Sequence, residues 1–87
     1  MLHLDTVINV KNKALIKQVG NRIRELRIER GLSQLDLADE AEVPLSQIGR
    51  IERGENNPTI STLYALCIAM KIDLKTLLNF ETQLLKI

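Results

Sequence analysis

The chain has 87 residues, with 12 Lys and Arg, 11 Asp and Glu, and a formal net charge of +1. This length fits one small domain and makes a second independent domain within the chain improbable. Hydrophobic residues form 45% and charged residues 26% of the chain, as in globular rather than disordered or collagen-like proteins. The near-neutral charge excludes a general attraction to nucleic acid or membranes, so any such affinity must come from where the charges lie.

The single cysteine, Cys67, excludes an internal disulfide and a metal site built from several thiolates of one chain. Its place on the apolar face of a predicted helix favours a small core residue. The sequence has no run of about 20 apolar residues that could cross a bilayer. Its N-terminus lacks the apolar segment and cleavage site of a secretory signal. We therefore expect a soluble, cytoplasmic protein without a membrane partner.

Apolar residues recur at helical rather than alternating spacing from Lys17 onward. Val19, Ile23 and Leu26 share one face of a first helix, which a basic last turn and Gly31 would end. The opposite face is polar and rich in arginine, and interspersed glutamates make a solvated, salt-bridged surface its simplest interpretation. The arginines of this face are Arg22, Arg24, Arg27 and Arg30.

A second helix of about nine residues should begin after Ser33, whose hydroxyl can cap the first turn while Asp36 bonds back to the Ser33 amide. The residue before a proline is pushed out of the α region, so this helix should end before Pro44. Pro44 in turn suits the start of a third helix. We predict that helix from about Leu45 to Arg53, with Gly54 as its stop.

Thr59 is the predicted cap of a fourth helix, and Asp73 is the predicted cap of a short fifth helix. Five short helices joined by short turns predict an all-α bundle. We expect the apolar side chains of the fourth helix to share one buried stripe: Ile60, Leu63, Tyr64, Cys67 and Met70. The fifth helix should contain Leu77, Leu78 and Phe80.

The two flanks are harder to interpret. Residues 1–15 fit a β-like arm as well as a loose helix. The tail over residues 81–87 carries three apolar side chains that a five-helix core has little room to bury: Leu84, Leu85 and Ile87. His3, the single histidine, lies in the first flank without a Ser or Cys in a triad-like relation to it. We therefore predict no enzyme, no metal site and no cofactor.

The second and third predicted helices are very short, are joined by a turn of a few residues, and are braced by the longer first helix, as in a helix-turn-helix unit. The third helix is narrow enough to enter a DNA major groove about 12 Å wide. The N-terminus of the second helix can face a phosphate, because its free amides and dipole favour an anion. In this arrangement Gln34 points at the DNA backbone, and the exposed face of the third helix reads bases.

Four blocks of residues carry a resemblance: Leu32-Ser33-Gln34-x-x-Leu37-Ala38, then Val43, then Gln47-Ile48-Gly49-Arg50-Ile51-Glu52-Arg53-Gly54, then Asn57-Pro58-Thr59-Ile60-x-x-Leu63. As a set they resemble the λ-repressor/Cro-like (Xre) helix-turn-helix family over roughly residues 19–80. The resemblance implies an all-α, five-helix λ-repressor-like DNA-binding bundle at residues 17–80, with the helix-turn-helix motif at residues 34–53. Residues 1–15 and 81–87 would form short flanking arms.

The resemblance also implies which residues contact DNA bases. Arg50 is favoured, because a guanidinium can bond bidentately to guanine, a contact worth about 1–3 kcal/mol of discrimination. A solvated or phosphate-binding arginine is the alternative for Arg50. Leu45 either touches a thymine methyl group or is a hydrophobic residue at the rim. The full set of implied base contacts is Pro44, Leu45, Ser46, Gln47 and Arg50.

Implied phosphate contacts lie at both ends of the helix-turn-helix. For Ser33 a capping role accompanies this one, and for Asn56 and Asn57 turn chemistry alone is the alternative. Arg27 and Glu52 match a family ion pair that joins the first helix to the third, the alternative being two surface charges of little energetic consequence. The full set of implied phosphate contacts is Arg22, Ser33, Gln34, Arg53, Asn56 and Asn57.

The sequence departs from the family at three positions. Glu42 and Lys71 stand where the family has glycine after a helix, and a non-glycine residue in the left-handed conformation costs about 1–2 kcal/mol. The strain is either tolerated or avoided by altered turns. Pro44 replaces the usual serine or threonine cap, so the third helix should begin without a side-chain acceptor. Acidic side chains of the second helix must point away from phosphate, namely Asp36, Asp39, Glu40 and Glu42.

We therefore expect a sequence-specific transcriptional regulator, a repressor or autoregulator, that binds double-stranded DNA. It would act as a homodimer on a pseudo-palindromic operator with half-sites one helical turn, about 34 Å, apart. The dimer surface would draw on the fifth helix and the apolar flanks. One alternative is an antitoxin-like module that keeps the fold and binds a protein partner through the flanks. Another is a structural helical bundle without a role in DNA binding.

Overall fold

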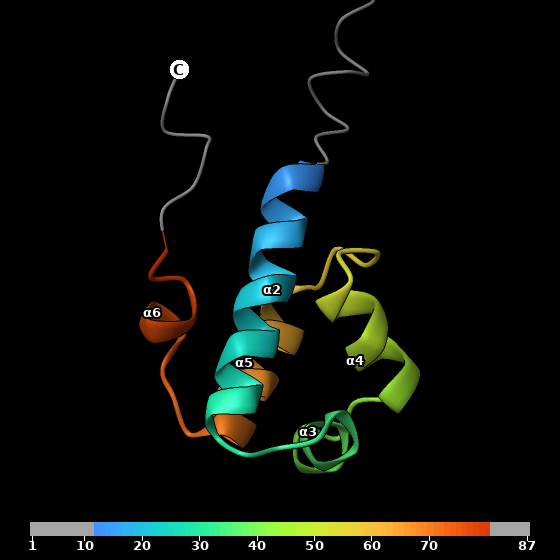
Figure 1. Cartoon of the computed structure of the whole chain (residues 1–87), viewed down its shortest axis with the longest axis vertical. Coiled ribbons are helices and arrows are strands. Elements are labelled where there is room, and N and C mark those ends of the chain that lie inside the picture. The colour runs from blue at the N-terminus through green and yellow to red at the C-terminus, as the bar shows by residue number, and fades with distance from the viewer. Residues whose placement is uncertain (1–11, 81–87) are drawn as a thin grey trace, which may run out of the picture.

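The computed structural model describes residues 12–80 (Figure 1). Within this range the chain forms helices and no strands, which confirms the predicted all-α bundle. In Figure 1 the long helix α2 lies between α4 and α6, with α3 at one end and α5 behind. The helices are α2 (Lys13–Glu29), α3 (Gln34–Ala41), α4 (Leu45–Glu52), α5 (Ile60–Met70) and α6 (Leu74–Leu77). Two sets of predictions lie outside the described residues: those for residues 1–11, with His3, and those for residues 81–87, with Leu84, Leu85 and Ile87.

The first helix begins four residues earlier than predicted, at Lys13. Asn12 caps it, and its side-chain oxygen accepts a hydrogen bond from the Leu15 amide at 2.8 Å. Leu15 and Ile16 then pack against the bundle. The predicted arm over residues 1–15 was therefore too long. Its last residues belong to α2 because Asn12 is a good cap and Leu15 and Ile16 continue the apolar spacing that leads to Val19.

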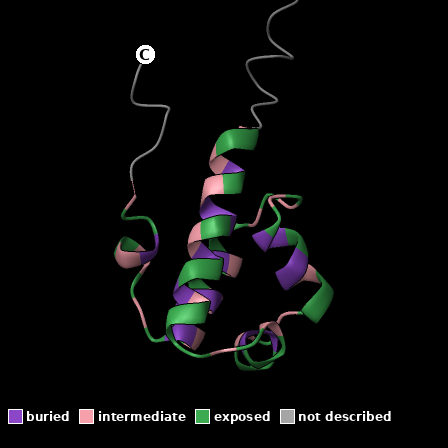
Figure 2. Cartoon of the chain, in the orientation of Figure 1, coloured by how far each residue is buried: buried purple, intermediate pink, exposed green. Residues whose placement is uncertain are grey.

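The core is built mainly from aliphatic side chains of all five helices, whose buried segments are purple in Figure 2. Cys67 lies within it, as predicted. Burial, with a smaller contribution from the charge of Asp73, raises the pKa of the Cys67 thiol, so the thiol stays protonated and unreactive. The other buried members of the core are Val19, Ile23, Leu26, Leu37, Ala38, Ile48, Ile51, Leu63, Leu66, Met70 and Leu77.

Two details of the C-terminal half differ from prediction. Ile60 and Tyr64 of α5 are 72% and 57% exposed instead of buried, whereas the rest of the predicted stripe is in the core. Most residues of α5 are apolar, so their spacing does not reveal which face is buried. The fifth helix is also shorter than predicted, because α6 ends at Leu77 and leaves Leu78 and Phe80 beyond its end.

The predicted caps of the last two helices are present. The Thr59 hydroxyl accepts from the Thr62 amide at 3.0 Å, and the Asp73 carboxylate accepts from the Thr76 amide at 2.7 Å. The hydrogen bonds from Thr76 hold the pKa of Asp73 below its ordinary value. Local hydrogen bonding at these two residues fixes where α5 and α6 begin.

A residue with positive φ follows each of α2, α3, α4 and α5, and amide bonds from the next residues fold back onto the last helical turn. Glycine occupies this position after α2 (Gly31, φ 69°) and after α4 (Gly54, φ 76°). Glu42 and Lys71 occupy it after α3 and α5, with φ of 57° and 59°. The chain therefore keeps these turns and tolerates left-handed non-glycine residues in them.

We expect Glu42→Gly to raise the free energy of unfolding by about 1 kcal/mol, because glycine removes the clash that a Cβ meets in the left-handed region. The matched control is Gly31→Ala, which adds a Cβ at φ 69° that meets nothing within 4 Å beyond its chain neighbours. It should destabilise by a similar amount. Urea unfolding followed by circular dichroism measures both changes. If Glu42→Gly were neutral or destabilising, the turn after α3 would carry no such strain.

Candidate nucleic-acid interface

The N-terminus of α3 is held by a reciprocal cap. The Asp36 amide donates to the Ser33 hydroxyl, and the Ser33 amide donates to the Asp36 carboxylate, both at 2.9 Å. Hydrogen bonds to the Asp36 carboxylate, from the Ser33 backbone first and from the Ser33 side chain second, lower the pKa of Asp36. Ser33 and Asp36 therefore form the predicted capping box. The amides of the first residues of α3 still point out of the helix end, where an anion can accept from them.

Helix α4 presents one face to solvent. Pro44 precedes it with φ −56° and ψ 140° and makes no side-chain cap, as predicted. Leu45, Ser46 and Arg50 are exposed, and Gln47 is half-buried. These predicted base-contacting residues therefore lie together at the start of α4 and one turn later. The opposite face of α4 packs into the core through Ile48 and Ile51 (Figure 2).

A buried ion pair joins α2 to α4. Arg27 Nε lies 2.7 Å from Glu52 Oε2, and Arg27 Nη2 lies 3.1 Å from Oε1. The two side chains are only 11% and 2% exposed, so this is not a pair of solvated surface charges. Arg27 Nη1 also donates to the Leu32 carbonyl at 2.8 Å. The pair therefore ties the end of α2 to the chain that enters α3 and to the end of α4.

Gln34 is a further member of this cluster. Its side-chain nitrogen donates to Glu52 Oε1 at 3.0 Å. No signal in the sequence indicated this bond, because it depends on how α3 packs against α4. A glutamine amide has two N–H donors, so one remains for a phosphate oxygen. Gln34 therefore helps to hold α4 in place and keeps a donor for its predicted contact.

Arg22 does not lie with the other predicted phosphate contacts. Its Nη2 donates to the Thr76 carbonyl at 3.0 Å, and its Nη1 lies 3.9 Å from Glu25 Oε1. Thr76 belongs to α6, which lies on the side of α2 opposite to α4 (Figure 1). Arg22 thus stabilises the packing of α6 against α2.

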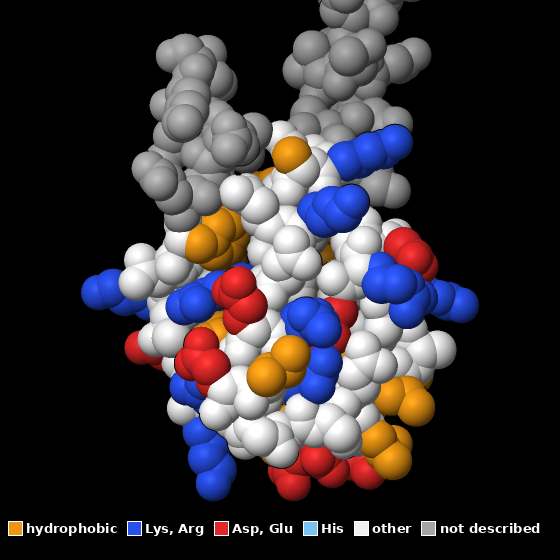
Figure 3. Space-filling model, viewed as in Figure 1, with side chains coloured by type: hydrophobic (Ala, Val, Ile, Leu, Met, Phe, Trp, Pro, Cys, Tyr) orange, Lys and Arg blue, Asp and Glu red, His pale blue; other side chains and the backbone are white. Residues whose placement is uncertain are grey.

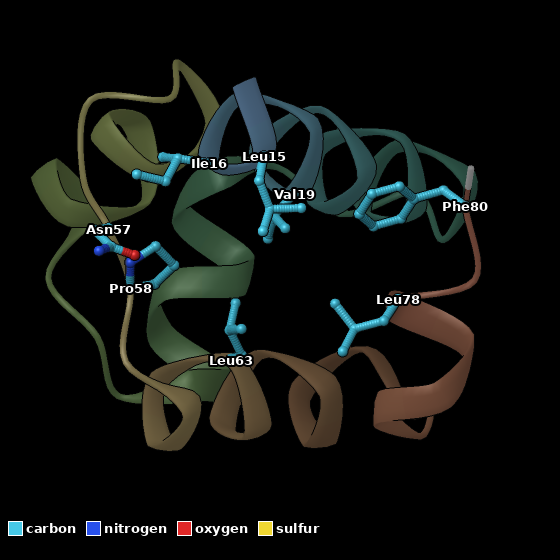
Figure 4. Close-up of a pocket in the computed structure, with 8 residues that line it drawn as sticks. All are labelled: Leu15, Ile16, Val19, Asn57, Pro58, Leu63, Leu78 and Phe80. Carbon is cyan, nitrogen blue, oxygen red and sulfur yellow. The ribbon is translucent and has the colours of Figure 1, made fainter. Parts of the chain in front are cut away.

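The loop between α4 and α5 holds the remaining predicted contacts. Arg53 and Glu55 form an exposed pair, with Nε 2.7 Å from Oε2. Asn56 is half-buried, and Asn57 is exposed. Asn57 also lines an apolar pocket of about 360 Å³ between this loop, α2 and the end of α6 (Figure 4). The other residues around the pocket are Leu15, Ile16, Val19, Pro58, Leu63, Leu78 and Phe80.

Gly20 sets the distance between α2 and α4, a role that no pattern in the sequence indicates. A Cβ added to Gly20 would overlap the carbonyl oxygen of Ile51 and would lie 3.1 Å from that of Glu52. The last turn of α4 therefore rests directly on the backbone of α2. The absence of a side chain at Gly20 is what lets α4 approach α2 this closely.

Acidic side chains gather over α3 on the surface shown in Figure 3. Exposed acidic side chains on this surface are Asp36, Asp39, Glu40 and Glu42.

None of the helices within residues 12–80 combines the length and the apolar character needed to cross a membrane. In the same range no three His, Cys, Asp or Glu side chains gather to hold a metal ion.

Known proteins resemble this chain in sequence and in fold. The Immunity repressor protein of Bacillus phage phi105 is 41% identical over 64 residues, which cover 74% of this chain and 44% of the repressor. The restriction-modification controller protein C.AhdI of Aeromonas hydrophila superposes with a TM-score of 0.72 at 36% identity, covering 74% of this chain and 97% of the controller. A SinR/SinI protein complex gives a TM-score of 0.66 at 31% identity, covering 78% of this chain and 72% of that chain.

The chain spans about half the length of the first curated relatives that it matches. These relatives are named as a repressor and a transcriptional regulator, not as enzymes, in line with the prediction of a non-enzymatic protein. A helix-turn-helix family model, HTH_3, matches residues 23–77, which include all of α3, α4 and α5. Because the match covers more than half of the chain, the chain belongs to the HTH_3 helix-turn-helix family.

Proposed function

We propose that this chain is a sequence-specific DNA-binding transcriptional regulator, a repressor or autoregulator, that inserts α4 into the major groove. One observation carries the proposal. The buried Arg27–Glu52 pair ties α4 to α2, and the opposite face of α4 stays exposed to solvent. A rigid, solvent-facing helix of eight residues is the kind of element that reads base edges in the groove. Function would then be equilibrium binding, without turnover.

The side chains of this face differ in what they can recognise. Arg50 can donate two hydrogen bonds to guanine, and Ser46 and Gln47 can donate or accept at other base edges. Leu45 is 46% exposed and has no polar group, which suits contact with a thymine methyl group. Pro44 would lie at the margin of this set. We propose phosphate contacts for the N-terminus of α3 and the α4–α5 loop, through Ser33, Gln34, Arg53, Asn56 and Asn57.

We also propose that the chain acts as a homodimer on a pseudo-palindromic operator. A single module of this size buries about 600–1,000 Å² on DNA, so a second copy is a usual way to gain affinity. The exposed residues Ile60, Tyr64 and Ile68 follow one another at helical spacing on α5, and Leu78 at the end of α6 is 44% exposed. These apolar side chains support a dimer surface formed by α5, α6 and the flanks.

Selection of bound sequences from random duplex DNA tests the proposal. The wild type should enrich a site with two-fold symmetry. Arg50→Ala should lose the preference at one base pair in each half-site, at a cost of about 1–3 kcal/mol, while its binding to random DNA stays nearly unchanged. Arg24→Ala, which removes the same charge from an exposed position on α2, is the matched control.

The outcome separates the two interpretations of Arg50. Equal loss on all sequences would make Arg50 a phosphate contact instead of a base contact. An unsymmetrical site would contradict the dimer, and failure to enrich any sequence would contradict sequence-specific binding.

A second candidate function is an antitoxin-like module that binds a protein partner. The same exposed apolar face of α5 favours it, and so does the likeness to a chain of the SinR/SinI complex. Tyr64→Lys distinguishes the two uses of this face. The substitution should abolish self-association if the α5 face binds a second copy of the chain. Unchanged self-association would indicate that the face binds a different protein.

A further inference from the structure

The side chain of Arg53 forms an ion pair with Glu55 in the free protein. Arg53 Nε lies 2.7 Å from Glu55 Oε2, and Arg53 Nη2 lies 3.2 Å from Oε1, so both carboxylate oxygens are used. The hydrogen bonds from Arg53, together with the nearby charges of Arg53 and Arg50, hold the pKa of Glu55 below its ordinary value. The carboxylate therefore stays charged and paired at neutral pH.

The turn after α4 places this carboxylate where it is. Gly54 has φ 76°, and the Glu55 amide donates to the Arg50 carbonyl at 2.8 Å. This bond fixes the backbone of Glu55 against the last turn of α4. On the other side, the guanidinium of Arg53 lies over Gly49, 3.0 Å from where a Cβ of that residue would be. The Arg53–Glu55 pair thus lies near Arg50, the side chain of α4 that is proposed to read a base.

A carboxylate that accepts two parallel N–H bonds from arginine has the same binding geometry as a phosphate. We infer that Glu55 competes with the DNA backbone for Arg53, so that Arg53 contacts a phosphate only after that phosphate displaces the carboxylate. The inference rests on the proposed DNA-binding function, and it assigns to Glu55 the role of limiting the affinity for DNA. It fits Figure 3, in which acidic and basic side chains adjoin on the α4 side of the molecule.

The exposure of the pair makes such an exchange feasible. Arg53 and Glu55 are 59% and 54% exposed, and exposed ion pairs contribute little to stability. A phosphate can therefore displace the carboxylate without disturbing the fold. The buried Arg27–Glu52 pair differs in this respect, because its burial holds it in place. Glu55 would weaken every contact with DNA that depends on Arg53, and random DNA and an operator would both be affected.

Binding of Glu55→Gln to a random-sequence duplex at several salt concentrations tests the inference. Glutamine keeps the shape of the side chain and removes its charge. We expect affinity near 0.1 M salt to rise about threefold to fivefold. The slope of log affinity against log salt should become steeper by about 0.9, the value for one additional phosphate contact. The matched control is Glu25→Gln, which makes the same charge change at an exposed residue on the α6 side of α2.

The double variant Arg53→Gln with Glu55→Gln tests whether the effect passes through Arg53. It should bind no more tightly than Arg53→Gln alone. If Glu55→Gln behaves like Glu25→Gln, or if its gain persists without Arg53, the competition is refuted while the proposed function stands. If the wild type does not bind duplex DNA at all, the proposed function and the inference fail together.

Discussion

Replacing Arg27 with methionine is expected to lower the free energy of unfolding by about 3–5 kcal/mol, because it leaves the Glu52 carboxylate buried without its counter-charge. The Glu52 side chain is 2% exposed and loses two of its three hydrogen bonds in this variant. Only the bond from Gln34 remains. Small domains have total stabilities of about 5–15 kcal/mol, so the variant should lie close to the folding threshold. Urea unfolding at neutral pH measures the loss.

The double variant Arg27→Met with Glu52→Leu is the control for this interpretation. Removing both charges leaves no buried ion, so the double variant should be more stable than Arg27→Met alone. If the single and double variants were equally destabilised, lost packing rather than the unpaired charge would be the cause.

The local signals of the sequence predicted most helix boundaries. Ser33 with Asp36, Thr59 and Asp73 act as caps in the structure, and each lies within three residues of the group that it bonds. Such contacts depend only on neighbouring residues, so their pattern is visible in the sequence. Asn12 is a cap of the same kind and was missed, because the mixed apolar pattern of residues 1–15 fits a β-like arm as well as a loose helix.

Contacts between helices were harder to predict, because they depend on how the helices pack. The resemblance to a known family implied the Arg27–Glu52 pair, which the structure contains. Spacing alone indicated neither the bond from Gln34 to Glu52 nor that from Arg22 to Thr76, which join residues 18 and 54 positions apart. The exposed apolar face of α5 was missed for another reason: an apolar helix gives no contrast between its faces.

In the candidate DNA-binding surface, too, some features could be predicted from local sequence and others depended on the three-dimensional structure. The exposed positions of α4 follow from helical geometry once its boundaries are known, so the grouping of Leu45, Ser46 and Arg50 was predictable. The pairing of Arg53 with Glu55 was not, because it depends on the turn at Gly54 and on the rotamers of two exposed side chains. A charged residue that is predicted from its position to contact a phosphate can already form an ion pair with a neighbouring residue, as Arg53 does with Glu55.

Gly20→Ala is expected to destabilise the fold by about 3 kcal/mol or more, although alanine is the better helix former by about 1 kcal/mol. The added methyl group would collide with the backbone carbonyl of Ile51, which cannot move unless α4 shifts as a whole. Gly49→Ala is the matched control, because its methyl group meets only the end of the Arg53 side chain. That variant should be as stable as the wild type or more so. Near-equal unfolding free energies for the two variants would show that α2 and α4 can separate at little cost. A large loss confined to Gly20→Ala would identify this backbone contact as what sets the position of α4.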